Sequence, residues 1–201
     1  MTGKEVKVFC PESTQQWRAW LLENHDTENA VWVIFYKNKS ENPTISWSDA
    51  VDEALCFGWI DSIAKPIDEE KFMRFFSRRK AKSVWSRINK QKVERLISAG
   101  LMTKKGIESI EVARENGSWT ILDDAESLII PADLETELEK KPNAKSYFLN
   151  LSKSDKKNIL QWIVLAKRAE TRQRRIVEIA EIAAQNLKPK VIQWTKKTTN
   201  D

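Results

Sequence analysis

The chain has 201 residues, a formal net charge of +5, nine tryptophans, one histidine and two cysteines. A chain of this length buries roughly 70% of its unfolded surface on folding, so its core needs neither disulfides nor a metal ion. One histidine with two cysteines excludes an ordinary zinc site, and no run approaches the roughly 20 apolar residues of a membrane span. Loops that bind phosphate or dinucleotides, and nucleophile elbows, are also missing from the sequence.

The first part of the sequence alternates between helix and strand patterns. Ser13 begins a capping box, and the apolar side chains that follow it recur with the period of a helix. The run from Ala30 to Tyr36 is wholly apolar and aromatic, as in a strand that is covered on both faces. Gly58 suits the left-handed residue that ends a helix. We therefore expect a helix from Ser13 to about Asn24, a strand at 30–36, a helix from Ser46 to Gly58, and a hairpin of strands 59–65 and 71–76.

Beyond the hairpin, residues 77–82 form a basic turn and the remaining periodic segments are helical. Ser83 or Ser86 caps the first of these segments. Residues 118–130 form an acidic connector. The other expected elements are a helix that ends at Gly100, one from Thr103 to Gly117, one from Pro131 to about Lys140, one over 144–149, one from Ser152, one from Thr171, and a polar tail at 188–201.

These elements predict an α+β fold in which a small, mainly antiparallel three-stranded sheet is packed by helices. We expect an α+β core domain at 1–120, a helical C-terminal region at 121–187 and a polar tail at 188–201. The first residues carry no apolar signal-peptide core, and the two cysteines fit reduced thiols, so we expect a cytoplasmic protein. Cys56 lies in an apolar run and is expected to be a buried structural thiol, with a nucleophile as the alternative.

The charge is unevenly distributed along the sequence. Residues 71–95 hold ten Lys and Arg against one acid, a net charge of +9, and residues 153–175 have a net charge of +6. Residues 108–139 hold ten acids against one arginine. Such asymmetry is typical of a protein with an anionic partner, but it also fits basic and acidic faces that meet inside the fold or face water.

Three stretches of the sequence carry a family resemblance. They are, in chain order, residues 47–62, residues 74–89 with Arg74-Phe75-Phe76-Ser77-Arg78-Arg79-Lys80, and residues 162–176 with Trp162-Ile163 and Arg174-Arg175-Ile176. In this order they resemble the YdeI/OmpD-associated family, also called the bacteriocin-protection family, over about residues 13–187. The resemblance implies a bacterial protein linked to envelope stress and to resistance against cationic antimicrobial peptides or bacteriocins. It supplies no established reaction and no catalytic residues.

The sequence departs from the family pattern at one turn. The family usually has Phe-Thr-Pro-Arg where this chain has Phe76-Ser77-Arg78-Arg79. Because proline restricts the backbone, its replacement is expected to loosen this turn and any site built on it.

Basic residues of the hairpin are candidates for a ligand site. Asp61 could pair with Arg74 or Arg79, either as a structural ion pair or as a polar group in a pocket. Arg79 and Lys80 lie near Trp85 in the sequence, and arginine binds phosphate or carboxylate through two hydrogen bonds. Trp85 could be a stacking platform or a core residue.

A second candidate group lies at the start of the expected last helix. Arg172 and Arg175 lie there although cations at a helix N-terminus oppose the helix dipole. Their charge could be balanced by the acidic stretch 108–139, by an external anion, or by solvent alone.

Together these features predict a stress-protection protein without catalytic activity, which binds an envelope-related partner protein or an anionic ligand. One alternative is a nucleic-acid-binding module that uses the basic segments 71–95 and 153–175. Another is a small-molecule enzyme with a site near Cys56, Asp61 and Arg79. We expect no metal site and no cofactor, and the sequence does not predict an oligomeric state.

Overall fold

The computed structural model describes residues 6–37, 40 and 44–193. Contacts divide the chain into two compact units, of which the first ends at Trp119 and the second begins at Thr120. Each unit has its own hydrophobic core, and the two are described separately. No helix in the described ranges is long and apolar enough to cross a membrane.

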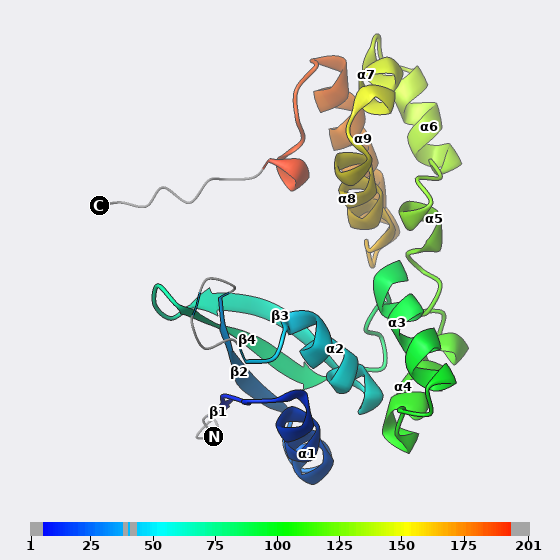
Figure 1. The fold of residues 1–201 in the computed structure, drawn as a ribbon. Helices are drawn as coiled ribbons and strands as arrows, with labels where there is room; N and C mark the ends of the chain where they lie inside the picture. Colours follow the sequence, from blue (N-terminus) through cyan, green and yellow to red (C-terminus); the bar gives the residue numbers. More distant parts are fainter. Residues whose placement is uncertain (1–5, 38–39, 41–43, 194–201) are drawn as a thin grey trace, which may run out of the picture. The chain divides into compact units, whose positions relative to one another are not determined.

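The first unit combines a sheet with helices (Figure 1). Its elements are β1 (Lys7–Phe9), α1 (Thr14–Asn24), β2 (Ala30–Tyr36), α2 (Trp47–Cys56), β3 (Trp59–Pro66), β4 (Lys71–Arg78), α3 (Arg87–Ser98) and α4 (Lys104–Glu115). The predicted hairpin is confirmed, since β3 and β4 pair in antiparallel orientation.

The prediction of three strands was wrong. The described residues form a four-stranded mixed sheet in the order β1-β2-β4-β3, with β1 parallel to β2 and the other pairs antiparallel. Strand β1 has three residues, too few to show an alternating pattern. Strand β4 continues through Ser77 and Arg78, which the sequence placed in a turn, because these residues still pair with Ala30 and Trp59.

The core of this unit lies on one face of the sheet. Alternate residues of β2 (Val31, Val33 and Phe35) are fully buried there. Trp17 of α1 packs edge-on against Phe76, and its indole N–H donates to the carbonyl oxygen of Ala50 at 3.0 Å. The helices and the sheet therefore share one aromatic core that fixes the ends of β3 and β4.

Helices α2 and α4 are in close contact. A Cβ atom on Gly106 of α4 would lie 2.3 Å from the carbonyl oxygen of Cys56. The hydroxyl of Thr103, which caps α4, donates to the same carbonyl at 2.7 Å. Gly58 follows α2 with a φ of +70°, so the chain reverses there and enters β3. This junction brings α4 next to the beginning of β3.

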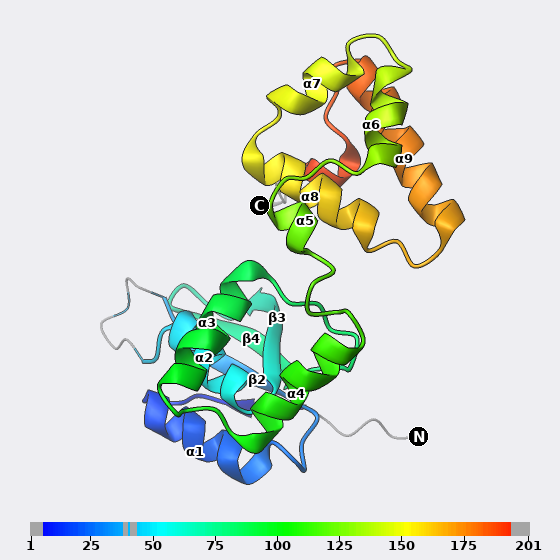
Figure 2. The same cartoon turned by 90° about the vertical axis from the view of Figure 1, so that its right-hand side faces the viewer.

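The second unit is helical in its described part (Figure 2). Its elements are α5 (Asp123–Glu126), α6 (Ala132–Glu139), α7 (Ala144–Asn150), α8 (Lys153–Val164), α9 (Ala169–Ala184) and the 3₁₀ helix Lys190–Ile192. Leu134, Phe148, Ile163 and Ile176 are fully buried in its core.

Several expected boundaries in this unit differ from the structure. The acidic connector contains helix α5, and α9 begins at Ala169, two residues before Thr171. Pro131 is the residue before α6, not part of its first turn. The expected tail at 188–201 contains a 3₁₀ helix whose Ile192 is buried, while residues 194–201 lie outside the described residues.

Candidate functional site

A pocket of about 300 Å³ lies in the first unit, where β3 begins and β4 ends. Its walls come from the loop after α1, from Phe57, Gly58 and Trp59, from residues 78–81, from Trp85 and from α4. We call it the Arg79 pocket. Three of its features bear on function: an arginine with free donors, two indole groups and an excess of positive charge.

Arg79 is held firmly, but two of its donors are free. Its backbone N–H donates to the carbonyl oxygen of Gly58 at 2.9 Å, and its Nη1 donates to that of Val84 at 3.2 Å. The guanidinium lies 3.5 Å from the centre of the Trp85 ring. Its Nε and Nη2 are buried and have no hydrogen-bond partner among the described residues. Burial lowers the pKa of Arg79 to about 9, and the nearby charge of Asp61 acts in the opposite direction.

Two tryptophans of the pocket also have free donors. Trp59 and Trp85 are fully buried, and neither indole N–H finds a hydrogen-bond partner within the described ranges. Over the described part of the chain, six buried side-chain polar atoms lack a partner, and four of them belong to residues lining this pocket. A buried polar group without a partner costs about 1–3 kcal/mol. Such a concentration indicates a place where a ligand or water completes the hydrogen bonding.

The charges around the pocket are mainly positive. The cations of its lining are Arg78, Arg79, Lys80 and Lys105, and the carboxylates are Asp26 and Glu108, which gives a net charge of +2 with histidine neutral. Arg78 donates to backbone carbonyl oxygens, not to a carboxylate, and Lys105 pairs with Glu108 at 2.9 Å. The lining therefore favours an anion.

Asp61 and Arg74 form an ion pair outside this pocket. Asp61 Oδ2 accepts from Arg74 Nη1 at 2.6 Å and from the indole of Trp47 at 2.9 Å. The Arg74 guanidinium also lies 4.0 Å from the centre of the Trp47 ring. Of the two partners that the sequence left open for Asp61, the structure gives it Arg74.

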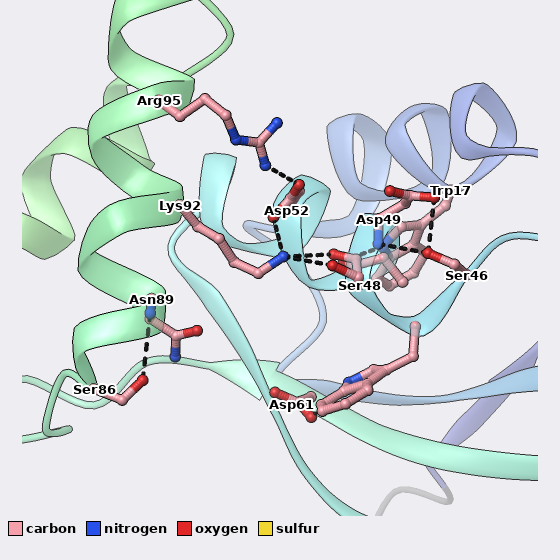
Figure 3. Close-up of polar contacts among 12 residues, drawn as sticks. Trp17, Ser46, Ser48, Asp49, Asp52, Asp61, Ser86, Asn89, Lys92 and Arg95 are labelled. Carbon is pink, nitrogen blue, oxygen red and sulfur yellow. Dashed lines mark hydrogen bonds and ion pairs between the residues drawn. The ribbon is translucent and has the colours of Figure 1, made fainter.

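Asp61 and Trp47 line a second pocket of about 360 Å³ between α2 and α3. Lys92 donates there to Ser48 at 2.8 Å and to Asp52 at 2.6 Å, and Arg95 pairs with the same Asp52 (Figure 3). Asp52 and Asp61 are thus each paired with a cation, and the cations Arg74, Lys92 and Arg95 each have a carboxylate partner, in contrast to Arg79.

Arg172 and Arg175 lie in the second unit and have partners within it. Arg172 donates to both oxygens of Asp133, at 2.7 and 2.9 Å, so the acidic stretch 108–139 supplies its partner. Arg175 donates to the carbonyl oxygen of Trp162 and lies over the ring of the same residue. The structure thus places Arg79, Lys80 and Trp85 in one pocket, while Asp61 with Arg74, and Arg172 with Arg175, lie elsewhere.

Comparison with family models divides the chain in a similar way. A family described as "Domain of unknown function (DUF8412)" matches residues 9–109, half of the chain. The chain belongs to the DUF8412 family. A second model, described as "Bacteriocin-protection, YdeI or OmpD-Associated", matches residues 127–186 and confirms the predicted resemblance for the C-terminal part. The searches against curated proteins and against solved structures found no match.

Within the DUF8412 region, the sequence reasoning missed three residues that shape the Arg79 pocket. Phe57, Trp59 and Lys105 line it, but only the position of Trp59 directly after Gly58 gave a signal. Lys105 reaches the pocket through the contact between α2 and α4, which no local pattern reveals.

Cys56 of the DUF8412 region is buried, as expected, and burial raises the pKa of its thiol to about 11. A thiol with such a pKa is almost wholly protonated at neutral pH, and the thiolate is the nucleophilic form. This property disfavours a nucleophilic role for Cys56.

Proposed function

We propose that the chain is a stress-protection protein of the YdeI/OmpD-associated type, which acts in the cytoplasm by binding an anionic ligand in the Arg79 pocket. The match of residues 127–186 to the bacteriocin-protection family supports the protective role. That role includes resistance to cationic antimicrobial peptides, and an envelope-related partner protein is the other candidate for what the chain binds. The proposed activity is binding without catalysis.

The observation that carries this proposal is the pair of free donors on Arg79. Nε and Nη2 are adjacent on the guanidinium, and together they form the fork that binds both oxygens of a carboxylate or phosphate. In this chain Arg172 uses the same two nitrogens on Asp133. In Arg79 the same two nitrogens are buried and have no hydrogen-bond partner among the described residues, so an external anion that reaches them would take the place that Asp133 takes for Arg172.

The basic segment 71–95 gives less support to nucleic-acid binding than its charge of +9 indicates. At least seven of its ten Lys and Arg make contacts within the first unit. These are Arg74 with Asp61, Arg78 with two carbonyl oxygens, Arg79 with Trp85, Lys92 and Arg95 with Asp52, Lys71 with Tyr36, and Lys90 with Trp119. The nucleic-acid alternative stays a prediction, with steep salt dependence as its signature.

The proposal is tested by survival of bacteria that depend on this chain during exposure to a cationic antimicrobial peptide. Arg79→Gln removes the fork and the charge, and should abolish the gain in survival while the protein accumulates normally. Arg175→Gln is the matched control, because Arg175 also lies over a tryptophan but has its own acceptor. If bacteria with Arg79→Gln survive as well as bacteria with the parent chain and with Arg175→Gln, the Arg79 pocket has no role in protection.

A further inference from the structure

We infer that the ligand of the Arg79 pocket is a small phosphate monoester, held by its dianionic head with its organic group against the apolar side chains of the lining. The inference rests on the proposed anion-binding function and narrows it to one chemical class. Three properties of the pocket support it: the type of its hydrogen-bonding groups, its net charge, and the combination of its volume with its apolar lining.

The buried side-chain polar atoms of the pocket residues that lack a partner are all donors. Arg79 offers Nε–H and Nη2–H, and Trp59 and Trp85 each have an indole N–H without a partner in the described part of the chain. The arginine fork requires two oxygens on one atom. A phosphate monoester supplies that pair of oxygens and a third strong acceptor oxygen. A carboxylate has only the pair. Lys80 is exposed in the lining and is a donor for this third oxygen, so the donors favour phosphate.

The net charge of the lining also distinguishes the candidate anions. Arg78, Arg79, Lys80 and Lys105 exceed Asp26 and Glu108 by two charges. A phosphate monoester carries about −1.5 to −2 at pH 7 and neutralises this excess. A carboxylate or a phosphodiester carries one negative charge and would leave the pocket positive.

The volume and the apolar walls indicate an organic phosphate. The pocket encloses about 300 Å³, at the lower end of the roughly 300–1,000 Å³ of pockets that hold small molecules. Ala81 and Val112 line the pocket and are exposed, so they provide apolar surface beside the charged groups. An inorganic phosphate ion would leave this surface uncovered, whereas a small ester group would cover it.

Isothermal titration calorimetry of the full chain with four probes at pH 8 and constant ionic strength tests the inference. The probes are phenyl phosphate, its monoanionic methyl ester, benzoate and inorganic phosphate. We expect phenyl phosphate to bind at least about tenfold more tightly than each of the others, because it alone combines two charges with an apolar group. Equal affinity for the methyl ester or benzoate overturns the phosphate monoester, and equal affinity for inorganic phosphate overturns the role of the apolar wall.

Two variants connect the binding to the pocket. Arg79→Lys keeps the charge but loses the fork, and should weaken phenyl phosphate about tenfold or more. Lys80→Gln is a milder second variant at an exposed cation of the lining, and should weaken it about threefold, while Arg175→Lys in the second unit should leave it unchanged. Should Arg79→Lys lower the melting temperature strongly, Lys80→Gln decides, and no loss of affinity in it overturns the inference.

The outcomes separate this inference from the proposed function. Arg79-dependent binding of benzoate without preference for phenyl phosphate overturns the phosphate class and leaves anion binding intact. Absence of binding for all four probes overturns both. Vesicles that contain phosphatidic acid present the same phosphate monoester on a lipid. If the chain sediments with these vesicles and Arg79→Lys abolishes the sedimentation, the ligand is a membrane lipid and the inference of a soluble ligand is overturned.

Discussion

Replacement of Arg79 by methionine separates a ligand-binding arginine from a structural one. Burial lowers the pKa of Arg79 to about 9, which corresponds to a penalty of about 5 kcal/mol on the charged guanidinium in the folded state, at about 1.36 kcal/mol per pH unit. Arg79→Met removes this penalty. It also removes the stacking on Trp85, worth about 2 kcal/mol for a desolvated cation, and the hydrogen bond to Val84, worth about 1.5–3 kcal/mol. The free energy of unfolding should therefore change by no more than about 1.5 kcal/mol.

The penalty on Arg79 is fully present at neutral pH. Below pH 9 the arginine is charged in both the folded and the unfolded chain, so folding must bury the charge. Only as the pH rises above about 9 does the folded state lose the proton before the unfolded chain does, and stability then increases through this group. An assay at pH 7 consequently measures the whole effect.

Arg74→Met is the matched comparison. It leaves the carboxylate of Asp61 with the indole of Trp47 as its remaining donor among the described residues. Removal of one partner from a largely buried ion pair costs about 3–5 kcal/mol, so Arg74→Met should be clearly destabilising where Arg79→Met is not.

Urea unfolding followed by tryptophan fluorescence provides the measurement. Seven of the nine tryptophans lie within residues 1–119, so the signal reports mainly on the first unit. The buffer should contain no phosphate, since a bound anion would stabilise the parent chain. A loss of more than about 3 kcal/mol in Arg79→Met, comparable to the loss in Arg74→Met, would refute the reasoning and make Arg79 a structural residue.

Three further predictions concern the scaffold. Gly106→Ala places a Cβ 2.3 Å from a backbone oxygen and should lower the free energy of unfolding in urea by about 3 kcal/mol. Gly100→Ala has open space around its Cβ and should lower it by about 1 kcal/mol through its positive φ. Equal losses would contradict the close contact of α2 and α4. A maleimide at pH 8 should label exposed Cys10 and leave buried Cys56 unlabelled, because burial raises the pKa of Cys56 to about 11. Mass spectrometry measures the labelling, and rapid labelling of both residues would show that the thiol of Cys56 is accessible. The hydrogen bond from Arg172 lowers the pKa of Asp133. The contribution of Asp133 to stability is therefore present above about pH 4 and is lost as the pH falls further. The stability of Asp133→Asn should depend less on acid, and an acid transition unchanged from that of the parent chain would contradict this.

Helix boundaries were the most predictable part of the fold because their signals are local. The side chains of Ser13, Ser46, Ser86, Thr103 and Ser152 each accept the backbone N–H three residues later, as their spacing indicated. Each of these caps involves one turn of chain. Strand β1 could not be predicted in this way, because its pairing with β2 joins residues 24 positions apart, such as Lys7 and Val31.

The candidate site was only partly predictable, since it depends on the register of the sheet. Sequence spacing left Asp61 with two possible arginines. The strand pairing shifts between Asp61 and Ala64, and Ala64 is then the residue opposite Arg74. This irregularity lets Arg74 reach Asp61, and Arg79 remains without a carboxylate partner among the described residues. Residue types indicated a basic pocket, but only the fold shows which arginine keeps free donors.

Arg78, which stands where the family usually has proline, is held by hydrogen bonds at the end of β4. The backbone N–H of Arg78 donates to the carbonyl oxygen of Asn29 at 3.2 Å, a bond that the family's proline could not make. Its side chain donates to the carbonyl oxygens of Glu28 and Asp26, both at 2.7 Å. Three hydrogen bonds thus join the end of β4 to the loop that forms one wall of the Arg79 pocket. Because these acceptors are uncharged, Arg78 fixes the wall and still adds its full positive charge to the lining.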